Sequence, residues 1–455
     1  LSVLDTVDPD SILACSQRLD PTKSLYVVST KSGSTVETLS LMKYFYSEEI
    51  FELGKDEASK HFIAITDPGS PLSGTADEFH FRGKFLNDPN IGGRYSALSY
   101  FGLVPAALLG LDVGRLLDDA MSAVHACEST VSTAENPGAW LGVVLGELAK
   151  AGRDKVTLIS SRQIASFCDW VEQLIAESTG KDGKGLLPVV GEPLGGPEVY
   201  GNDRLFVYLR LEGDTEYDEG VSRLEAAGQP VVRIQLHDLY ELGRQFFIWE
   251  MAVAIAGYVI GINPFDQPNV ESAKALARKN LEEYKSKGVL SVPQHDLFGG
   301  DILVYGKVQG NTIEESLTNF LNELTPGAYA ALLAYVKQTE GTDTVLEVIR
   351  KKIRDRYKVA TTVGYGPRYL HSTGQLHKGD AGRGLFLQIT SQDARDLDVP
   401  DEMGGSSSSV SFSVLKQAEA MGDQVALAQA GRRIIRFHLT DVERDLGRLN
   451  EALVW

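Results

Sequence analysis

Leu25-Tyr-Val-Val-Ser-Thr-Lys-Ser-Gly-Ser-Thr-Val-Glu-Thr38 is the stretch that decides the fold class. Its first four residues are an apolar run typical of a buried strand, and residues 29–38 are a polar loop. Residues 39–45 then form an amphipathic run typical of a helix, through Leu39, Leu41, Met42 and Phe45, and residues 61–66 predict a second strand. Strand, helix and strand in this order favour a parallel sheet, so we expect an α/β fold.

The loop of this stretch is rich in hydroxyl groups, from Thr30, Ser32, Ser34 and Thr35. Between a strand and a helix, backbone N–H groups and the positive end of the helix dipole converge on one spot. A phosphate would fit there, with the hydroxyls as further donors. No Gly-Lys-Ser/Thr triplet is present, which excludes an ordinary nucleotide P-loop. The alternative is a helix cap with spare hydroxyls.

Length and charge narrow the class of protein. At 455 residues the chain exceeds one ordinary core, so we expect two or three domains. Its net charge of −18 argues against a nucleic-acid or anionic-membrane partner, while leaving room for a local basic pocket. Three widely spaced cysteines match neither a disulfide framework nor a zinc pattern and suit a reducing cytoplasm. No signal-peptide pattern or membrane span is recognisable in the sequence.

Two glycines precede an arginine at Gly92-Gly93-Arg94, ahead of an apolar helix predicted over residues 95–109. Glycines let a backbone pass close to a ligand, and the guanidinium can reach an anion. The alternative is a plain turn with a solvated charge.

A helix is predicted over residues 163–178, ending at Thr179-Gly180. Gln173 and Glu177 are four residues apart and so share one face. In the last turn the helix dipole disfavours negative charge, which makes a carboxylate a better proton acceptor. A surface glutamate at a helix end is the alternative.

A stiff elbow is predicted at Gly261-Ile-Asn-Pro-Phe-Asp-Gln-Pro-Asn-Val-Glu-Ser-Ala-Lys274. A buried helix over residues 239–260 stops at the glycine, two prolines hold the backbone out of a helix, and Asn269 is expected to cap the next one. The elbow places Asp266, Gln267 and Lys274 beside the end of a buried element. A capped turn between helices is the alternative.

Residues 364–379 gather His371, Gln375, His377 and Lys378 on a glycine-rich segment after a predicted strand, where α/β sheets place their sites. The spacing of the two histidines matches no metal motif. The remaining elements follow from periodicity and turn signals. Helices are predicted at 112–130, 140–151, 219–227, 274–287, 312–324, 342–357, 412–430 and from 441, and strands at 155–159, 204–211, 230–236, 301–306, 358–363, 385–389 and 433–439.

Four of these stretches occur in an order that resembles the glucose-6-phosphate isomerase family: residues 30–38, 92–94, 173–181 and 263–274. The resemblance covers roughly residues 25–290. The long extension that follows, to Trp455, resembles the isomerase half of a bifunctional transaldolase/glucose-6-phosphate isomerase fusion. We accordingly expect the chain to be truncated at its N-terminus, since it opens with Leu1 and nothing before Leu25 resembles the family's first glycine/serine-rich loop.

The resemblance implies two sugar-isomerase (SIS) domains of the flavodoxin-like, three-layer α/β/α kind with parallel sheets, and a C-terminal α/β extension. We expect an N-terminally incomplete first SIS domain at 1–140, a second at 141–290, and at 291–455 an extension that completes the second domain and the active site.

The resemblance also implies a reaction, the interconversion of glucose 6-phosphate and fructose 6-phosphate through a cis-enediolate. Glu177 would move the proton between C1 and C2, Arg94 would stabilise the intermediate, and Lys274 would complete the catalytic set. No metal or organic cofactor is implied. The expected substrate-binding residues are Thr30, Lys31, Ser32, Ser34, Thr35, Gly93, Gln173, Gln267 and Gln375.

The ring-opening histidine departs from the family pattern. It normally follows the catalytic glutamate within a segment Leu-His-Ser-x-Gly-Gln, but here Val190-Gly-Glu-Pro-Leu-Gly195 stands there instead. The pattern recurs as Leu370-His-Ser-Thr-Gly-Gln375, so we expect His371 to open the ring through a rearranged connectivity. His237 is the alternative.

A second class of function is a regulatory SIS module that binds a sugar phosphate without turning it over. The presence of Glu177, Arg94 and Lys274 favours the enzyme. We expect a cytoplasmic homo-oligomer of central sugar metabolism, with a transaldolase domain upstream. Acceptance of mannose 6-phosphate stays open.

Overall fold

The computed structural model describes residues 1–306 and 308–453. It forms two compact units, each assembled from three stretches of chain. The first unit comprises Leu1–Arg115, Arg278–Ser291 and Asp393–Ala418, and the second comprises Leu116–Ala277, Val292–Gln392 and Glu419–Trp455. Three of the unit boundaries fall inside helices, namely α6 (Val113–Ala126), α11 (Glu271–Lys287) and α15 (Phe412–Gln429).

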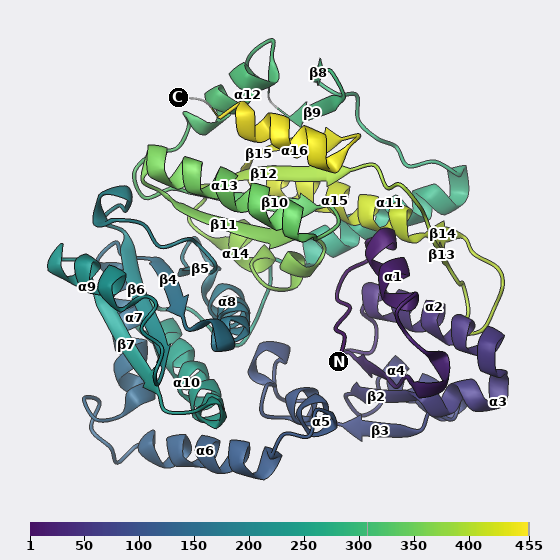
Figure 1. Ribbon diagram of the computed structural model, residues 1–455, viewed down its shortest axis with the longest axis horizontal. Helices are drawn as coiled ribbons and strands as arrows, with labels where there is room; N and C mark the ends of the chain where they lie inside the picture. The colour runs from purple at the N-terminus through teal and green to yellow at the C-terminus, as the bar shows by residue number, and fades with distance from the viewer. Residues whose placement is uncertain (307, 454–455) are drawn as a thin grey trace. The chain divides into compact units, whose positions relative to one another are not determined.

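The first unit is built on a parallel three-stranded sheet of order β1-β2-β3. Tyr26 of β1 pairs with Phe62 of β2, and their rings stack at 4.8 Å between centroids. Helices α2 and α4 pack on the sheet (Figure 1). The predicted strand–loop–helix–strand order is confirmed. Its elements are α1 (Pro9–Ser16), β1 (Tyr26–Ser29), α2 (Val36–Leu53), α3 (Lys55–Ala58), β2 (Phe62–Thr66), α4 (Pro71–Glu78), β3 (Gly83–Leu86) and α5 (Tyr100–Leu108).

Residues from the C-terminal part of the chain complete the first unit. Strands β13 (Asp398–Val399) and β14 (Val410–Ser411) pair antiparallel before α15 begins. Lys416 of α15 is only 2% exposed and forms ion pairs with Asp8, at 2.8 Å, and Asp393. A buried ammonium needs such partners, so this cluster fixes the start of α15 against the N-terminal helix within the unit.

The second unit contains a parallel four-stranded sheet of order β5-β4-β6-β7. Strand β6 is buried along most of its length, as its Leu-Phe-Val-Tyr-Leu run predicts. Helices lie between the strands in the chain, which gives the expected α/β alternation. The elements are α7 (Pro137–Lys150), β4 (Lys155–Ser160), α8 (Ala165–Thr179), β5 (Leu187–Val189), β6 (Arg204–Leu211), α9 (Asp218–Ala226), β7 (Val231–Leu236) and α10 (Leu242–Ile260).

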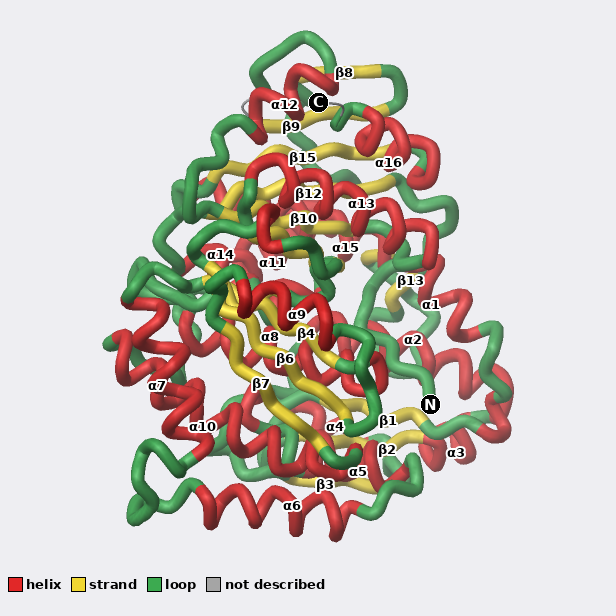
Figure 2. The backbone as a smooth tube through the Cα atoms, turned by 60° about the vertical axis from the view of Figure 1, so that its left-hand side comes forward, coloured by secondary structure: helices red, strands yellow, loops and turns green. Residues whose placement is uncertain are grey.

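A second sheet in this unit comes from the C-terminal residues, in the order β11-β10-β12-β15-β9-β8 (Figure 2). Its four parallel strands repeat the 2-1-3-4 order of the four-stranded sheet, whereas β9 and β8 are antiparallel. The elements are β8 (Leu297–Gly299), β9 (Ile302–Gly306), α12 (Ile313–Leu321), β10 (Tyr329–Tyr335), α13 (Glu340–Tyr357), β11 (Ala360–Tyr365), α14 (Gly374–Gly379), β12 (Gly384–Ser391), β15 (Arg433–Leu439) and α16 (Val442–Glu451).

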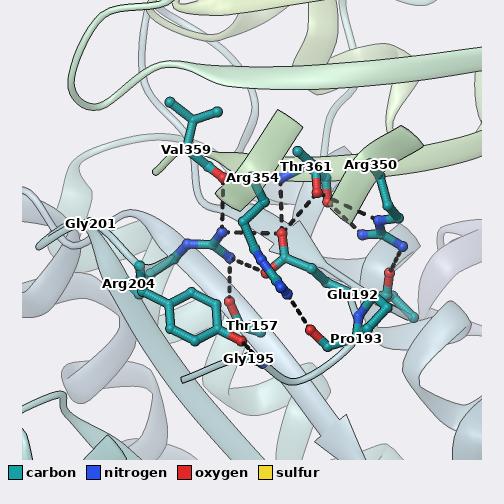
Figure 3. A network of polar contacts seen from close by, with 12 residues as sticks. Thr157, Glu192, Pro193, Gly195, Gly201, Arg204, Arg350, Arg354, Val359 and Thr361 are labelled. Atoms are coloured by element: carbon teal, nitrogen blue, oxygen red, sulfur yellow. Dashed lines mark hydrogen bonds and ion pairs between the residues drawn. The ribbon is translucent and has the colours of Figure 1, made fainter. Parts of the chain in front are cut away.

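A buried charge cluster joins the two sheets of the second unit (Figure 3). Glu192, in the loop after β5, pairs with Arg204 of β6 and accepts from the Thr361 backbone at 3.1 Å and from its hydroxyl at 2.9 Å. From α13, Arg350 donates to the Val190 carbonyl at 3.0 Å, and Arg354 donates to the Pro193 carbonyl. The loop that departs from the family pattern therefore anchors the C-terminal sheet.

Helices α7 and α10 pack closely within the second unit (Figure 1). A Cβ atom added at Gly142 would lie 2.6 Å from the Ala252 carbonyl oxygen, and one at Gly146 would lie 2.6 Å from Val259 Cβ. Only glycine permits this approach of the two backbones. The contact fixes α10, which carries the predicted elbow at its C-terminal end.

The α/β class with parallel sheets is confirmed. The three predicted domain ranges, 1–140, 141–290 and 291–455, stay a prediction. The two compact units are defined by contacts between residues and do not test where each SIS domain begins and ends. Strand β10 is not among the predicted strands, although all seven of its residues are buried at the middle of the C-terminal sheet. Its run Tyr-Ala-Ala-Leu-Leu-Ala-Tyr is alanine-rich and carries no strand signature.

Candidate active site

The hydroxyl-rich loop of the first unit lies between β1 and α2, as predicted. Thr35 is the N-cap residue of α2, but its side chain makes no capping hydrogen bond. Its hydroxyl lies 2.8 Å from that of Thr30, while Ser34 Oγ donates to Ser32 Oγ at 3.0 Å. The hydroxyls are thus paired with one another beside an uncapped helix start, an arrangement suited to an anion.

Gly33 fixes the shape of this loop. Its φ of +65° lies in the left-handed region that favours glycine. An added Cβ would lie 2.8 Å from the backbone nitrogen of Leu72 and 2.9 Å from the side chain of Ser70. The loop therefore rests directly on the start of α4, and a larger residue at this position would displace it.

Lys31 has its own partners outside the group of hydroxyl-bearing residues. Its ammonium forms an ion pair with Asp67 and donates to the Pro89 carbonyl at 3.0 Å. The side chain is engaged with the turn after β2, so its contact with a substrate stays a prediction.

Arg94 lies in the short 3-10 helix η3 (Gly93–Tyr95) of the first unit and is 2% exposed. Its guanidinium lies 5.2 Å from the centroid of the Tyr95 ring. The Gly93 carbonyl accepts from Ser96 Oγ at 2.5 Å, which fixes the turn. A buried arginine held in this way is pre-organised for an anion, unlike the solvated arginine of the alternative interpretation.

In the second unit, Gln173 and Glu177 share one face at the end of α8, as their spacing predicts. Gln173 Nε2 donates to Glu177 Oε2 at 3.2 Å, and both side chains are half-buried on one face of the last two turns. The amide fixes the orientation of the carboxylate, which is the first requirement for a proton-transfer group.

Lys181 forms hydrogen bonds that fix the elbow, a role that the sequence motif alone does not predict. It is 2% exposed, and its ammonium donates to the Asn263 carbonyl and to Asp266 Oδ1, both at 2.8 Å, and to the Asp266 carbonyl. Because Lys181 follows Glu177 by four residues, it couples the end of α8 to the elbow.

The elbow itself begins where predicted. Gly261 ends α10 in the left-handed conformation, with φ +73° and ψ +54°. Gln267 is exposed on the turn, and Lys274 Nζ lies 3.3 Å from Glu271 Oε1 within the first turns of α11. The predicted Asn269 cap is wrong, because α11 begins at Glu271 and the Asn269 side chain accepts from Gln375 instead.

Gln375 has a positioning role in addition to the substrate contact that the resemblance implies, which stays a prediction. It is fully buried, and its Nε2 donates to the Gly180 carbonyl at 2.8 Å and to Asn269 Oδ1 at 2.7 Å. Its Oε1 accepts from the Asn269 backbone at 2.8 Å. Both amide hydrogens are therefore used inside the protein, where they join the end of α8 to the elbow.

The two candidate histidines lie at different places in the second unit. His371 is half-buried and precedes Ser372, whose hydroxyl lies 3.3 Å from Glu172 Oε1 of α8. His237 follows β7 directly and pairs with Glu212 at 3.1 Å, a hydrogen bond that raises the pKa of His237. His237 thus lies at the carboxyl end of the strands of the four-stranded parallel sheet. Helix α8 returns the chain from that end toward the amino end of the strands, so Glu177, in its last turn, lies toward the opposite end. This arrangement favours His371 over His237 as the candidate for ring opening.

Glu172 is a further titratable group, which the sequence does not single out. Burial, reinforced by the charge of Asp169, raises the pKa of Glu172 to about 7. It directly precedes Gln173 and contacts the residue after His371. In the sequence it is one of three acidic residues of an amphipathic helix, and no pattern singles it out.

Metal-binding clusters and membrane-spanning helices are absent from the described chain. Nowhere in it do three or more His, Cys, Asp or Glu side chains group as metal ligands would. None of the helices within residues 1–306 and 308–453 combines the length and apolar character that a membrane crossing requires.

The sequence of the chain is similar to those of known proteins. The family description Phosphoglucose isomerase matches residues 1–186. A protein named probable glucose-6-phosphate isomerase, from Methanococcus maripaludis, is 30% identical over 316 residues, which cover 61% of this chain and 70% of that protein. The chain belongs to the glucose-6-phosphate isomerase family. A glucose-6-phosphate isomerase of Enterococcus faecalis is 29% identical over 54% of this chain and 64% of its own length.

Two solved structures share the fold of this chain. A hypothetical protein from Thermus thermophilus matches with a TM-score of 0.56 and 27% identity, over 61% of this chain and 76% of that one. A glucose-6-phosphate isomerase from Chlamydia trachomatis matches with a TM-score of 0.51 and 21% identity, over 62% and 63%, which supports the fold alone.

Membership of the glucose-6-phosphate isomerase family makes the chain an enzyme that interconverts glucose 6-phosphate and fructose 6-phosphate. The alternative of a non-catalytic regulatory module finds no support in these relatives.

Proposed function

We propose that the reaction proceeds through a cis-enediolate, with Glu177 carrying the proton between C1 and C2. The observation that carries this proposal is the pair of Gln173 and Glu177 at the end of α8, with Nε2 and Oε2 at 3.2 Å. Proton transfer next to a carbonyl needs a carboxylate held within reach of both carbons. Lys181 and Gln375 supply the rigidity by tying this helix end to the elbow.

Other residues would stabilise the charge that develops. Arg94, buried and oriented by η3, would stabilise the enediolate oxygens as a preorganised cation. Gln267 and Lys274 of the elbow would complete the hydrogen bonds to the sugar. These roles rest on the family resemblance together with the burial and contacts of each residue.

The hydroxyl loop would bind the substrate phosphate. Thr30, Ser32, Ser34 and Thr35 present hydroxyls beside the uncapped start of α2, and the Gly93 backbone would add a contact. Phosphate binding away from the reacting carbons lets binding energy align the sugar. Lys31 would join this set by exchanging its Asp67 partner for the phosphate.

Ring opening is assigned to His371. It lies on the segment that α14 anchors to α8, whereas His237 lies at the carboxyl end of the strands of the four-stranded sheet. No metal or organic cofactor takes part in the proposed chemistry. The finer expectations, which are a cytoplasmic homo-oligomer and a transaldolase domain in the full-length protein, stay part of this proposal.

An experiment with two substrates tests these assignments. Fructose 6-phosphate must open its ring, whereas 5-deoxyfructose 6-phosphate lacks the hydroxyl that closes it. His371→Asn should lower kcat on fructose 6-phosphate about 100-fold or more and leave turnover of the deoxy substrate nearly unchanged. His237→Asn is the matched control and should change neither rate. Equal losses of His371→Asn on both substrates, or a selective loss in His237→Asn, would overturn the assignment.

A further inference from the structure

A cavity of about 360 Å³ lies in the second unit, apart from every residue assigned to the isomerase reaction. Strand β7 forms one wall, and the first turns of α7 and α10 form the others. These three elements lie side by side in Figures 1 and 2. The volume falls within the range of small-molecule sites, about 300–1,000 Å³. The outer edge of β7 is also where the four-stranded sheet ends.

Two polar side chains of α10 line this cavity without partners in the described chain. Gln245 is 5% exposed, and its Oε1 is buried with no hydrogen bond to any described residue. A buried unpaired acceptor is costly, so it indicates a missing donor. Arg244 is half-buried, and none of the residues in 1–306 and 308–453 provides its guanidinium with an ion pair or hydrogen bond. The cavity thus offers a place to both an anion and a hydrogen-bond donor.

One acid completes the polar set. Glu241 uses Oε2 to accept from the His237 backbone at 3.0 Å, and no lysine or arginine of the described chain pairs with it. Glu241 and Arg244 are three residues apart, so their side chains emerge about 5–6 Å from one another at Cβ. One cation and one anion at this separation match the two charges of a small zwitterion.

The charge balance argues against a plain phosphate. The other cations at the cavity already have partners, since Arg233 pairs with Glu225 at 2.8 Å and His237 with Glu212 at 3.1 Å. Asn136 caps the start of α7 by accepting from the Ala139 backbone. Asp238 caps η6 (Leu239–Glu241), which leads into α10, and the acidic Glu241 occupies the N-cap position of α10 itself. Among the described residues, a dianion would therefore meet a single unpaired cation.

Apolar side chains from all three elements also line the cavity. Trp140, which is 44% exposed, and Leu141 line it from α7, and Ile248 lines it from α10. Val232 and Ile234 line it from β7. Such a wall would take up an aliphatic or aromatic side chain, whose transfer from water is favourable.

We propose that this cavity binds an apolar α-amino acid, with its carboxylate on Arg244, its ammonium on Glu241 and Gln245, and its side chain against Trp140 and Ile248. The site does not depend on the proposed catalytic roles. Helix α10 begins at this cavity and ends at Gly261, where the elbow with Gln267 begins. An occupant would therefore contact the helix that leads into the elbow.

Calorimetric titration of the full chain with L-leucine tests the proposal. L-Leucine is expected to bind with a Kd below about 1 mM. Two matched probes each remove one charge: 4-methylvalerate lacks the ammonium and isopentylamine lacks the carboxylate. Each should bind at least about tenfold more weakly, because each loses a charge-assisted hydrogen bond. Equal binding of all three would refute zwitterion recognition.

Variants locate the site. Arg244→Gln should weaken L-leucine binding at least about tenfold, whereas Arg223→Gln, an exposed arginine on α9, should leave it unchanged. Gln245→Leu removes the unpaired acceptor, so it should weaken binding while keeping or raising thermal stability. No saturable binding of L-leucine up to about 10 mM, or binding unaffected by Arg244→Gln, would overturn the proposal. So would finding that a second copy of the chain covers the cavity in solution.

Discussion

Replacing Glu192 by glutamine should destabilise the second unit strongly. Glu192 and Arg204 are fully buried, with Oε2 and Nη1 at 3.0 Å. In Glu192→Gln the amide nitrogen would face that guanidinium, so two donors would meet and the arginine charge would lose its partner. Breaking a buried ion pair in this way costs about 3–5 kcal/mol. The other arginines of the cluster increase the cost, because burial already lowers the pKa of Arg350 to about 10 and the charge of Glu192 opposes this.

Thermal and urea unfolding measure the effect. A loss of about 3–5 kcal/mol corresponds to a fall in Tm of about 6–10 °C for a unit of this size. Glu225→Gln is the matched control, because Glu225 and Arg233 form an exposed pair with each side chain 41% accessible. Its loss should stay below about 1 kcal/mol. A Glu192→Gln variant no less stable than this control would refute the reasoning.

The same pair has a defined dependence on pH. Burial tends to raise the pKa of Glu192, but the charges of Arg204, Arg350 and Arg354 outweigh it and hold the pKa below its ordinary value of 4.5. A carboxylate with a depressed pKa contributes stability above its unfolded-state pKa and loses it as the pH falls. The difference between the parent and Glu192→Gln should therefore shrink below about pH 4.5.

Two further substitutions probe the helices of the second unit. Gly142→Ala places a Cβ 2.6 Å from the Ala252 carbonyl and should cost about 1–3 kcal/mol in urea unfolding, whereas Gly447→Ala, with open space around its Cβ, should gain about 0.5–1 kcal/mol. An equal response of the two would contradict the close approach of α7 and α10. Burial raises the pKa of Glu250 to about 8, so the parent should lose stability as the pH rises from about 4.5 to 8. Glu250→Gln should match the parent near pH 4 and exceed it by up to about 5 kcal/mol near pH 9, and parallel pH profiles would disprove the burial effect.

Local signals predict much of the fold. The sequence predicts β6 at residues 204–211 and β15 at 433–439, and both strands have those bounds. Their aromatic and β-branched content is a local property. Strand β10 escapes prediction because its alanines and leucines suit a helix equally well, and only its neighbours β11 and β12 make it a strand. Burial in a sheet is a tertiary property that such a run does not encode by itself.

The candidate site is predictable where one short motif holds the geometry. Gln173 and Glu177 meet because helical spacing brings them together. The assignment of Asn269 as a cap is wrong because its partner, Gln375, lies 106 residues further on. Glu192 lies 169 residues from Thr361 in the same way. Contacts of this range depend on how sheets and helices pack, which no motif in a single sequence records.

Solvent deuterium uptake at C2 of glucose 6-phosphate tests most directly whether Glu177 moves the proton. The parent should incorporate deuterium at C2 when the enediolate is protonated again at that carbon and returns to glucose 6-phosphate. Glu177→Gln should slow the uptake about 100- to 10,000-fold, the range for loss of a general base, while Glu147→Gln on the exposed end of α7 should match the parent. Uptake by Glu177→Gln at the rate of the parent would contradict the assignment of Glu177 as the base.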